Sequence, residues 1–600
     1  MCGIAGAFAF DRVAMPVDRA VVSQLNALQR RRGPDGEGFW SSDDGRLALA
    51  HRRLAIIGLG QDGAQPMTDA SGRWTVTFNG EIYNYVELRD ELRRAGQRLR
   101  TDTDTEVLIH VVAQWGEAGL RKLRGMFAFV LWDDLRKELW LARDPYGIKP
   151  LYVAERAGAL WFASQARPLA KCAPVDTARD PAALVGFYLW GHVPEPYSWW
   201  RGIRMFPAGH VQIVRLDESL RPPRPYLRVQ DAYLAQPARP LTEGELHELI
   251  LDTVRHHLVA DVPVGMFLSG GIDSIVIAAC AAETGVKLKT VTMAFDEFKD
   301  TPDDEAPQAE RAAAALGTDH ATVRIGRDEF EAIVDDFLEA MDQPTIDGLN
   351  TYLVSRAAAG QGLKVALSGL GGDELFGGYP SFRQIPLLLK GARVAALFPS
   401  IKNALESALW AMPRRLVPPK VAGLFGHGSN LGISYFLRRA LYLGNELDAL
   451  LDQAWLEEGL AAVTDDRLAD EVLRGFPPGT PLHAQISALE SCLYMRNQLL
   501  RDTDWASMAF GLEVRTPYVD AALIGRLGPA IASSAPPRKR DLARCSAGYS
   551  IPGRMKTGFV TPVRQWAIER AGAPERGLRG WANNVHRQFR KFEAQQRLAA

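Results

Sequence analysis

Hydrophobic and polar positions follow two different patterns along the chain, one before and one after residue 242. Residues 2–215 contain many short runs that alternate between apolar and polar residues or are wholly apolar, which is typical of β-strands. Helical spacing is clearest at 85–95 and 106–117. The pattern predicts a layered α+β domain of packed sheets. The predicted strands are 4–10, 46–57, 74–80, 126–134, 138–144, 159–164 and 210–214.

From residue 242 onward, helical and strand-like stretches alternate. Helical patterns at 241–258, 275–285 and 304–317 are interleaved with strand or strand-and-loop patterns at 262–271, 290–295 and 362–372. This alternation predicts parallel βαβ units, with a ligand site at the carboxyl ends of the strands. From about Pro386 the chain is mostly helical.

Two segments fall outside these patterns. Residues 216–241 are irregular and rich in proline, which predicts a linker. Residues 571–600 form a basic helical tail, for which a solvated helix is favoured over an element that binds a polyanion. We therefore expect one domain at 2–215, a linker at 216–241, a second domain at 242–570 and the tail.

The composition excludes several classes of protein. The chain has 600 residues, 47% hydrophobic and 24% charged, a balance typical of globular proteins. Its net charge of −1 gives no overall positive field for nucleic acid. No apolar run reaches the ~18 residues of a membrane-spanning helix, and the first residues lack the charged segment of a signal peptide. Five scattered cysteines without CxxC predict neither disulfides nor a zinc site, so we expect a cytoplasmic protein.

The sequence GLGQDG at 58–63 fits the G-x-G-x-x-G pattern of dinucleotide-binding proteins. That function requires a helix to begin at the motif and hold the pyrophosphate at its N-terminus. Instead, Pro66 and several turn residues follow, so we reject a dinucleotide site. The chain also lacks the GxxxxGK[ST], GxSxG and HExxH motifs.

Cys2 directly follows the initiator methionine. Removal of Met1 would leave a thiol beside a free α-amine, whose pKa near ~7.7–8.0 lets it act as a base. One residue would then supply both nucleophile and general base. On position alone, an incidental cysteine is the alternative.

Ordered motifs in the same domain favour the nucleophile. These are RRGPDG at 31–36, HRRLAI at 51–56, FNGEIYN at 78–84, TDTE at 103–106 and RDPYGIKPLY at 143–152. Together they closely resemble class II glutamine amidotransferases. The resemblance implies an N-terminal-nucleophile (Ntn) hydrolase domain with αββα layers.

The residues of these motifs suit attack on a glutamine amide. A thiolate attack creates an oxyanion, for which the side-chain amide of Asn79 and the N–H of Gly80 can be donors. Arg53 can bind the α-carboxylate through its planar fork. Asp104 and Glu81 can pair with the α-ammonium. Taken singly, Arg53 would be a surface charge and Asn79-Gly80 a hairpin turn, so the ordered set carries the argument.

A glycine-rich turn follows the first strand of the second domain. Residues 264–268 end in SGGIDS at 269–274, where a helix begins. Small residues let backbone N–H groups approach phosphates, and the helix N-terminus adds positive potential. The motif resembles the PP-loop of ATP pyrophosphatases, with a purely structural turn as the alternative. The resemblance assigns ATP binding to Leu268, Ser269, Gly270, Gly271, Asp273 and Ser274.

A second strand, at 365–367, repeats this design with Ser368, Gly369 and then Asp373. Two such parallel strands would enclose one polyphosphate, and Asp273 and Asp373 could share its Mg²⁺. Met293, in the predicted strand 290–295, either lines the adenine site or is a core methionine.

Later motifs at 504–517 and 554–559 match the family of glutamine-hydrolysing asparagine synthetases, and the resemblance extends from Cys2 to about Trp566. It implies an acyl-adenylate made from ATP and a carboxylate, and ammonia that travels internally to displace AMP. Lys556 would place a charge on the phosphates. Small-molecule substrates are implied, and a homodimer is compatible with the resemblance.

Two departures concern the acceptor. Leu370 stands where the family usually has a glutamate linked to forming the aspartyl-adenylate, and Trp505 replaces a usual basic residue. Leucine can neither accept a hydrogen bond nor orient a cation. Three hypotheses remain: conversion of L-aspartate to L-asparagine, the same chemistry on another carboxylate such as a uronic acid of a surface polysaccharide, and a catalytically weakened homologue acting as a binding protein. The intact candidate residues argue against the third.

Overall fold

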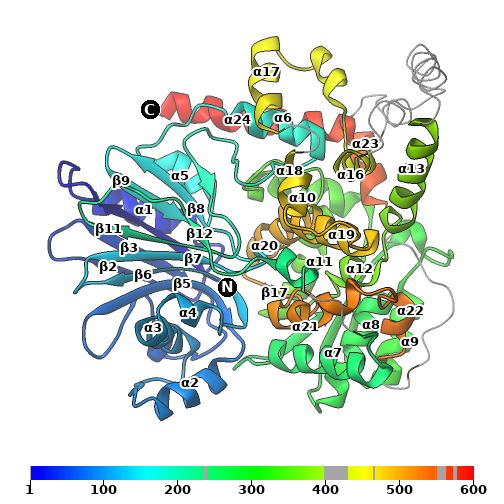
Figure 1. The fold of residues 1–600 in the computed structure, drawn as a ribbon, viewed down its shortest axis with the longest axis horizontal. Coiled ribbons are helices and arrows are strands. Elements are labelled where there is room, and N and C mark those ends of the chain that lie inside the picture. The colour runs from blue at the N-terminus through cyan, green and yellow to red at the C-terminus, as the bar shows by residue number, and fades with distance from the viewer. Residues whose placement is uncertain are drawn as a thin grey trace.

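The computed structural model describes residues 2–235, 239–396, 430–463, 467–546, 549, 562–571 and 577–599. Figure 1 shows the N-terminal domain, coloured blue to cyan, beside a larger domain built from the rest of the chain. Within the described ranges, none of the helices is both long and apolar enough to cross a bilayer.

Two six-stranded antiparallel sheets form the centre of the N-terminal domain. The first has the order β10 (Arg204–Met205), β8 (Tyr152–Arg156), β9 (Ala159–Ala163), β1 (Gly3–Ala9), β3 (Leu47–Arg53), β2 (Gly36–Ser41). The second has the order β12 (Arg224–Pro225), β11 (His210–Arg215), β7 (Glu138–Arg143), β6 (Gly125–Asp133), β5 (Trp74–Ile82), β4 (Met67–Thr68).

Helices cover both outer faces of this pair of sheets. On the first sheet lie α1 (Arg19–Leu28) and α5 (Ala166–Cys172), and on the second lies α3 (Asp104–Trp115), with α2 (Tyr85–Arg94) packed against α3. Between the sheets, apolar side chains of facing strands pack together, among them Phe8 and Trp132. The strand β6 is buried on both faces, which explains why the apolar run at 126–134 does not alternate with polar residues. The domain therefore has the predicted αββα layers.

The second domain contains a five-stranded parallel sheet. Its order is β15 (Asp319–Ile325), β14 (Lys289–Phe295), β13 (Val264–Phe267), β16 (Val365–Leu367), β17 (Glu513–Arg515). The helices α7 (Glu243–His257), α8 (Ile272–Glu283), α9 (Ala306–Leu316) and α11 (Leu349–Gly360) connect or cover these strands. The strand order reverses between β13 and β16, so their carboxyl ends form the crevice where α/β proteins bind ligands.

Local sequence signals explain several of these boundaries. Thr242 begins α7 because its side chain and that of Glu245 form a reciprocal capping box. In the sheet of the second domain, the predictions omitted β15 and β17. The first is a half-exposed edge strand with charged residues, and the second is three residues long and carries buried charges that hide a strand pattern.

Beyond the sheet, the chain is mostly helical, as predicted, and one long helical element crosses the domain. It runs through α19 (Leu482–Leu489), the π-helical segment η5 (Glu490–Leu500) and α20 (Arg501–Met508). Its length lets residues far apart on one element reach both the second domain's sheet and the N-terminal domain.

The segment 216–241 is bound to both domains along its described part. Its strand β12 extends the second sheet, and the hydroxyl of Tyr226 donates to the carbonyl of Arg143 at 2.9 Å. Further on, Tyr233 is buried and shares a hydrogen bond of 2.9 Å with Ser487 of the second domain. The proline-rich connection thus positions the domains relative to each other.

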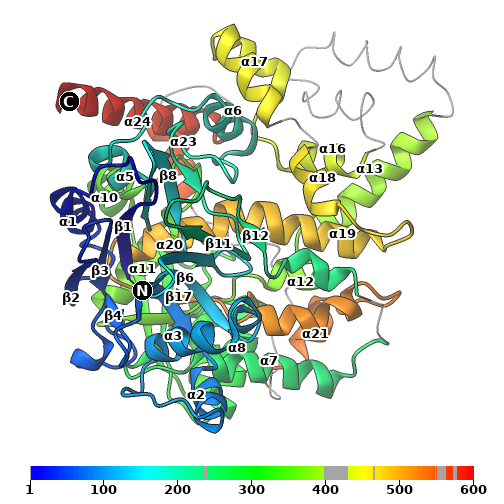
Figure 2. The ribbon, with the colours of Figure 1, turned by 60° about the vertical axis from the view of Figure 1, so that its left-hand side comes forward.

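The C-terminal tail forms the helix α24 (Arg579–Ala599), but the expectation that it is solvated is wrong for one of its faces. Trp581, Val585 and Phe589 are buried in the main core. The indole N–H of Trp199 donates to the carboxylate of Glu593 at 2.6 Å. Figures 1 and 2 show α24 lying against α6 (Pro181–Trp190). The basic composition concealed the apolar face because arginines fill the opposite one.

Candidate active sites

Cys2 directly precedes β1 and is 7% exposed. Its Sγ lies 4.0 Å from the carbonyl oxygen of Leu54, and its backbone N–H donates to Oδ1 of Asn79 at 2.9 Å. Burial raises the pKa of the thiol, since a thiolate loses solvation there. The thiol therefore needs a base to become a nucleophile, consistent with the predicted role of its own α-amine.

Asn79 and Gly80 lie on the second sheet, facing the start of β1. While Oδ1 of Asn79 holds Cys2, its buried Nδ2 has no hydrogen-bond partner among the described residues. A buried donor without a partner is costly unless a ligand supplies the acceptor. At Gly80, a Cβ would lie 2.1 Å from the carbonyl oxygen of Met126, so glycine is required. The pair has the chemistry of an oxyanion hole.

Arg53 ends β3, and its guanidinium is held by a loop rather than by a carboxylate. It donates to the carbonyls of Ile57, Gly58 and Gly60, the last at 2.8 Å. This loop is the G-x-G-x-x-G segment, which continues into the short 3₁₀ turn η1 (Gln61–Gly63) instead of a helix. As the sequence predicted, no helix begins at this motif, and the loop instead orients Arg53.

Asp104 and Glu81 are both buried near these residues. Asp104 begins α3 and accepts a hydrogen bond from the N–H of Ile82 at 3.1 Å. Burial raises the pKa of Asp104 to about 6. The carboxylate of Glu81 lies 3.7 Å from Arg515 of the second domain, and burial raises its pKa well above the ordinary value. The structure thus places Glu81 at the domain interface, and its contact with a substrate ammonium stays a prediction.

The two serine-glycine loops of the second domain meet at the carboxyl ends of β13 and β16. The hydroxyl of Ser274 bonds to the hydroxyl and carbonyl of Ser269, each at 2.9 Å, which closes the first loop. A Cβ on Gly369 would lie 3.0 Å from the N atom of Ser274. This close approach brings the two motifs together as predicted, although they are about a hundred residues apart in sequence.

Asp273 and Asp373 converge on the ammonium group of Lys539. Its Nζ lies 2.6 Å from Oδ1 of Asp373 and is also bonded to Oδ1 of Asp273. Burial opposes the charged form of Lys539, but the two carboxylates outweigh it and raise its pKa. Two carboxylates that share one cation are a donor set that suits Mg²⁺. Lys539 could not be identified from the sequence, because a lysine between two arginines gives no signal of a specific role.

A cavity of about 290 Å³ opens beside these loops. The predicted residues Leu268, Ser269, Gly271, Asp273, Ser274, Met293, Ser368 and Gly369 line it, and so does Leu370. Gly270 lies in the same loop, where its carbonyl accepts from Gln308 at 2.7 Å. Lys556 lies outside the described residues. We call this space the nucleotide cavity.

Buried charges connect the two sites. Arg32 donates from Nε to the carbonyl oxygen of Cys2 at 3.0 Å, and its other nitrogens bind both carboxylate oxygens of Asp504 at 2.7 and 3.1 Å. Lys149 lies 4.0 Å from the same carboxylate. The neighbouring Thr503 lines the nucleotide cavity. One element, α20, therefore reaches from the nucleotide cavity to the backbone of Cys2.

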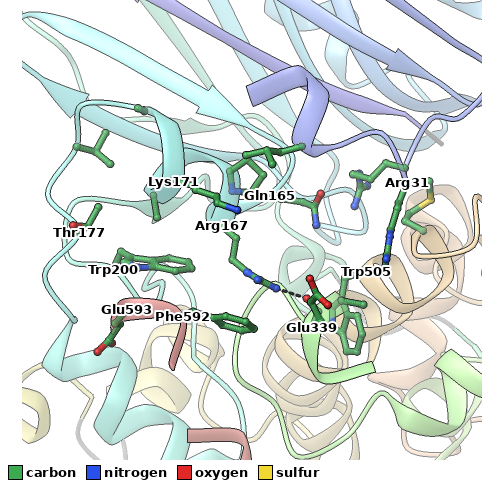
Figure 3. Close-up of a pocket in the computed structure, with 18 of the residues that line it drawn as sticks. Arg31, Gln165, Arg167, Lys171, Thr177, Trp200, Glu339, Trp505, Phe592 and Glu593 are labelled. Carbon is green, nitrogen blue, oxygen red and sulfur yellow. Dashed lines mark hydrogen bonds between the residues drawn. The ribbon is translucent and has the colours of Figure 1, made fainter. Parts of the chain in front are cut away.

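A separate cavity of about 660 Å³ lies between the domains. Figure 3 shows Arg167 extending from α5 toward Glu339, with Phe592 beside it and Arg31 and Trp505 on another side. Arg32 also lines this space, so the cavity borders the link between the two sites. Trp505 forms part of its wall.

Comparisons with known proteins agree with two different sites in the two domains. The family model "Glutamine amidotransferase domain" matches residues 1–226, and the model "Asparagine synthase" matches residues 245–580. A "Putative asparagine synthetase [glutamine-hydrolyzing]" of Mycobacterium tuberculosis is 32% identical over 94% of this chain and 88% of the relative. "Asparagine synthetase [glutamine-hydrolyzing] 1" of Bacillus subtilis is 31% identical with the same coverage.

A relative with a different name also matches. "Amidase chry2" of Gibberella zeae is 33% identical over 61% of this chain and 56% of its own length. The two family models, their order and the near-complete coverage of the bacterial relatives determine the classification. The chain belongs to the family of glutamine-hydrolysing asparagine synthetases and is a ligase of that type.

Proposed function

We propose that this chain hydrolyses glutamine at Cys2 and uses the ammonia and ATP to convert a carboxylic acid into its amide, with AMP and pyrophosphate as products. The observation that carries the proposal is the buried link from Cys2 through Arg32 to Asp504, whose neighbour Thr503 lines the nucleotide cavity. Burying charged groups costs desolvation free energy, so a chain of buried ion pairs between two sites supports coupling of the two sites in one reaction.

In the N-terminal site, the α-amine of Cys2 takes the thiol proton, and the sulfur attacks the amide carbon of glutamine. The oxyanion accepts hydrogen bonds from Nδ2 of Asn79 and the N–H of Gly80. The proton passes to the leaving ammonia, and water then cleaves the thioester to give glutamate. Arg53 and Asp104 hold the α-carboxylate and α-ammonium of the substrate.

In the second site, a carboxylate oxygen of the acceptor attacks the α-phosphorus of ATP, and the bond to pyrophosphate breaks. Ammonia then attacks the acyl carbon, loses a proton and displaces AMP. The loop at Ser269–Ser274 binds the phosphates through backbone N–H groups, and Lys539 supplies positive charge. Mg²⁺, held by Asp273 and Asp373, would neutralise charge on the phosphates.

The acceptor has two candidates. L-aspartate, giving L-asparagine, is suggested by the names of the relatives. Another carboxylate, such as a uronic acid of a surface polysaccharide, is favoured by Leu370, which lines the nucleotide cavity without any group to bind a second polar substrate.

Incubation of the purified protein with glutamine, Mg-ATP and aspartate tests the proposal. Equal amounts of glutamate, AMP and asparagine, measured by mass spectrometry, would support aspartate as the acceptor. AMP without asparagine would exclude aspartate and retain the chemistry. Glutamate without AMP, for every carboxylate offered, would refute the ATP-dependent half of the proposal.

A further inference from the structure

A further cavity, of about 580 Å³, adjoins the nucleotide cavity, and we call it the second cavity. The two share Asn350, which lies in the first turn of α11. The walls of the second cavity come from α6, η5, α16 (Leu431–Arg439) and α23 (Val563–Ala571). Its volume falls within the ~300–1,000 Å³ of pockets that bury drug-sized ligands.

Aromatic rings form much of this wall. Trp190, Tyr435, Tyr494 and Trp581 line the cavity, together with aliphatic side chains such as that of Leu578. Trp190 is 5% exposed, yet its indole Nε1 has no hydrogen-bond partner in the described part of the chain. Such a wall favours a ligand with a flat or ring-shaped apolar body and a hydrogen-bond acceptor at its edge.

Among the described charged groups that line the cavity, Arg438 carries a buried nitrogen without a hydrogen-bond partner. Arg439 is held by Glu490 at 2.6 Å and lies 3.6 Å from the ring centre of Tyr494. Arg564 lies near Asp347: burial raises the pKa of that carboxyl, and the positive charge of Arg564 partly offsets the increase. Arg438 has no carboxylate partner among the described ion pairs, and its buried Nε lacks any hydrogen-bond acceptor there.

We infer that this second cavity binds the body of the acceptor, and that the acceptor is a bulky carboxylic acid with an aromatic or other ring-shaped body and a second anionic group for Arg438. The inference rests on the proposed function, in which the reacting carboxylate must enter the nucleotide cavity. The rest of the acceptor must then occupy adjoining space, and Asn350 marks that junction. The Oδ1 atom of Asn350 is buried without a partner in the described chain, so it can accept a hydrogen bond from the acceptor.

A molecule as small as aspartate would leave the aromatic wall unfilled. It would also leave Arg438 and Nε1 of Trp190 without acceptors, and unsatisfied buried polar groups weaken binding. Leu370 agrees with this conclusion, because it gives the nucleotide cavity apolar surface and no side-chain group that could bind a polar one. The second cavity, rather than the nucleotide cavity, therefore recognises the body of the acceptor.

The test is acceptor-dependent exchange of pyrophosphate into ATP by the full chain, without glutamine. Aspartate is compared with N-benzoylaspartate, and succinate with phenylsuccinate, so that each pair differs by one aromatic body. For at least one aromatic acid, we expect a rate of pyrophosphate exchange about tenfold or more above that of its small counterpart. In Arg438→Gln the KM for that acid should rise roughly tenfold, as loss of a charge-assisted hydrogen bond predicts, with the KM for ATP and the glutaminase rate unchanged.

Two further variants define the outcome. Leu578→Trp, which narrows the second cavity, should weaken use of the aromatic acid, while Arg467→Gln, at an exposed arginine paired with Glu471, should change nothing. Equal or better exchange with the small acids, unaffected by Arg438→Gln, would overturn the inference and retain the proposed function. A rise in the KM for ATP in place of that for the acid would assign the cavity to the nucleotide and overturn it too. No exchange with any acid would refute adenylation itself.

Discussion

Asn79 offers the sharpest test of the N-terminal site. Its Oδ1 accepts the N–H of Cys2 at 2.9 Å, while its buried Nδ2 is available for the oxyanion. In Asn79→Ala one of the two expected oxyanion donors is lost, which typically lowers kcat by about 10²–10³-fold, or about 2.7–4 kcal/mol. Because the donor acts on charge that develops in the transition state, the KM for glutamine should change much less.

Glutamate release measures this effect, and synthesis with ammonium chloride in place of glutamine shows whether the rest of the protein is intact. The variant also orphans the N–H of Cys2, so a loss of stability of about 1–3 kcal/mol is expected. Asn84→Ala is the matched control, since both its amide atoms bond locally, to Lys122 and Arg124, outside the site. A kcat for Asn79→Ala within threefold of the wild type, in folded protein, would show that Asn79 is not an oxyanion donor.

Three further predictions concern the same machinery. The intact-protein mass should lack one methionine, and Cys2→Ser should lose glutaminase activity but keep ammonium-dependent synthesis; a mass that retains Met1 in active protein would contradict the α-amine as base. The kcat/KM for glutamine should fall tenfold per pH unit below about pH 6, because Asp104, with its pKa raised by burial, becomes neutral there and cannot pair with an ammonium; Asp104→Asn should abolish this limb of the pH profile. Asp504→Asn leaves the buried Arg32 without its partner and should lower the free energy of unfolding in urea by about 3–5 kcal/mol. Because the link is expected to couple the two sites, glutamate release by this variant should exceed AMP release. An unchanged ratio of the two products would argue against coupling.

Motifs with a fixed local geometry were predictable from the sequence. SGGIDS runs from the turn after β13 into the first turn of α8, because small residues and a helix start are local properties. The predicted strands near Cys2 and Asn79 follow their apolar patterns. The short, charged strand β17 was not predictable. Its Arg515 and Glu513 are buried because they pair with each other at 2.7 Å, and pairing is a tertiary property.

By itself, the sequence determined the order of the two domains, their fold classes and the residue types of both constellations, since these depend on local spacing and composition. The tertiary structure alone decided what those residues face. It placed Lys539 between Asp273 and Asp373, joined Cys2 to Asp504 through Arg32, and set Leu370 beside a cavity that continues past Asn350. These contacts span tens to hundreds of residues, and a sequence pattern carries no record of which distant side chains share a buried space.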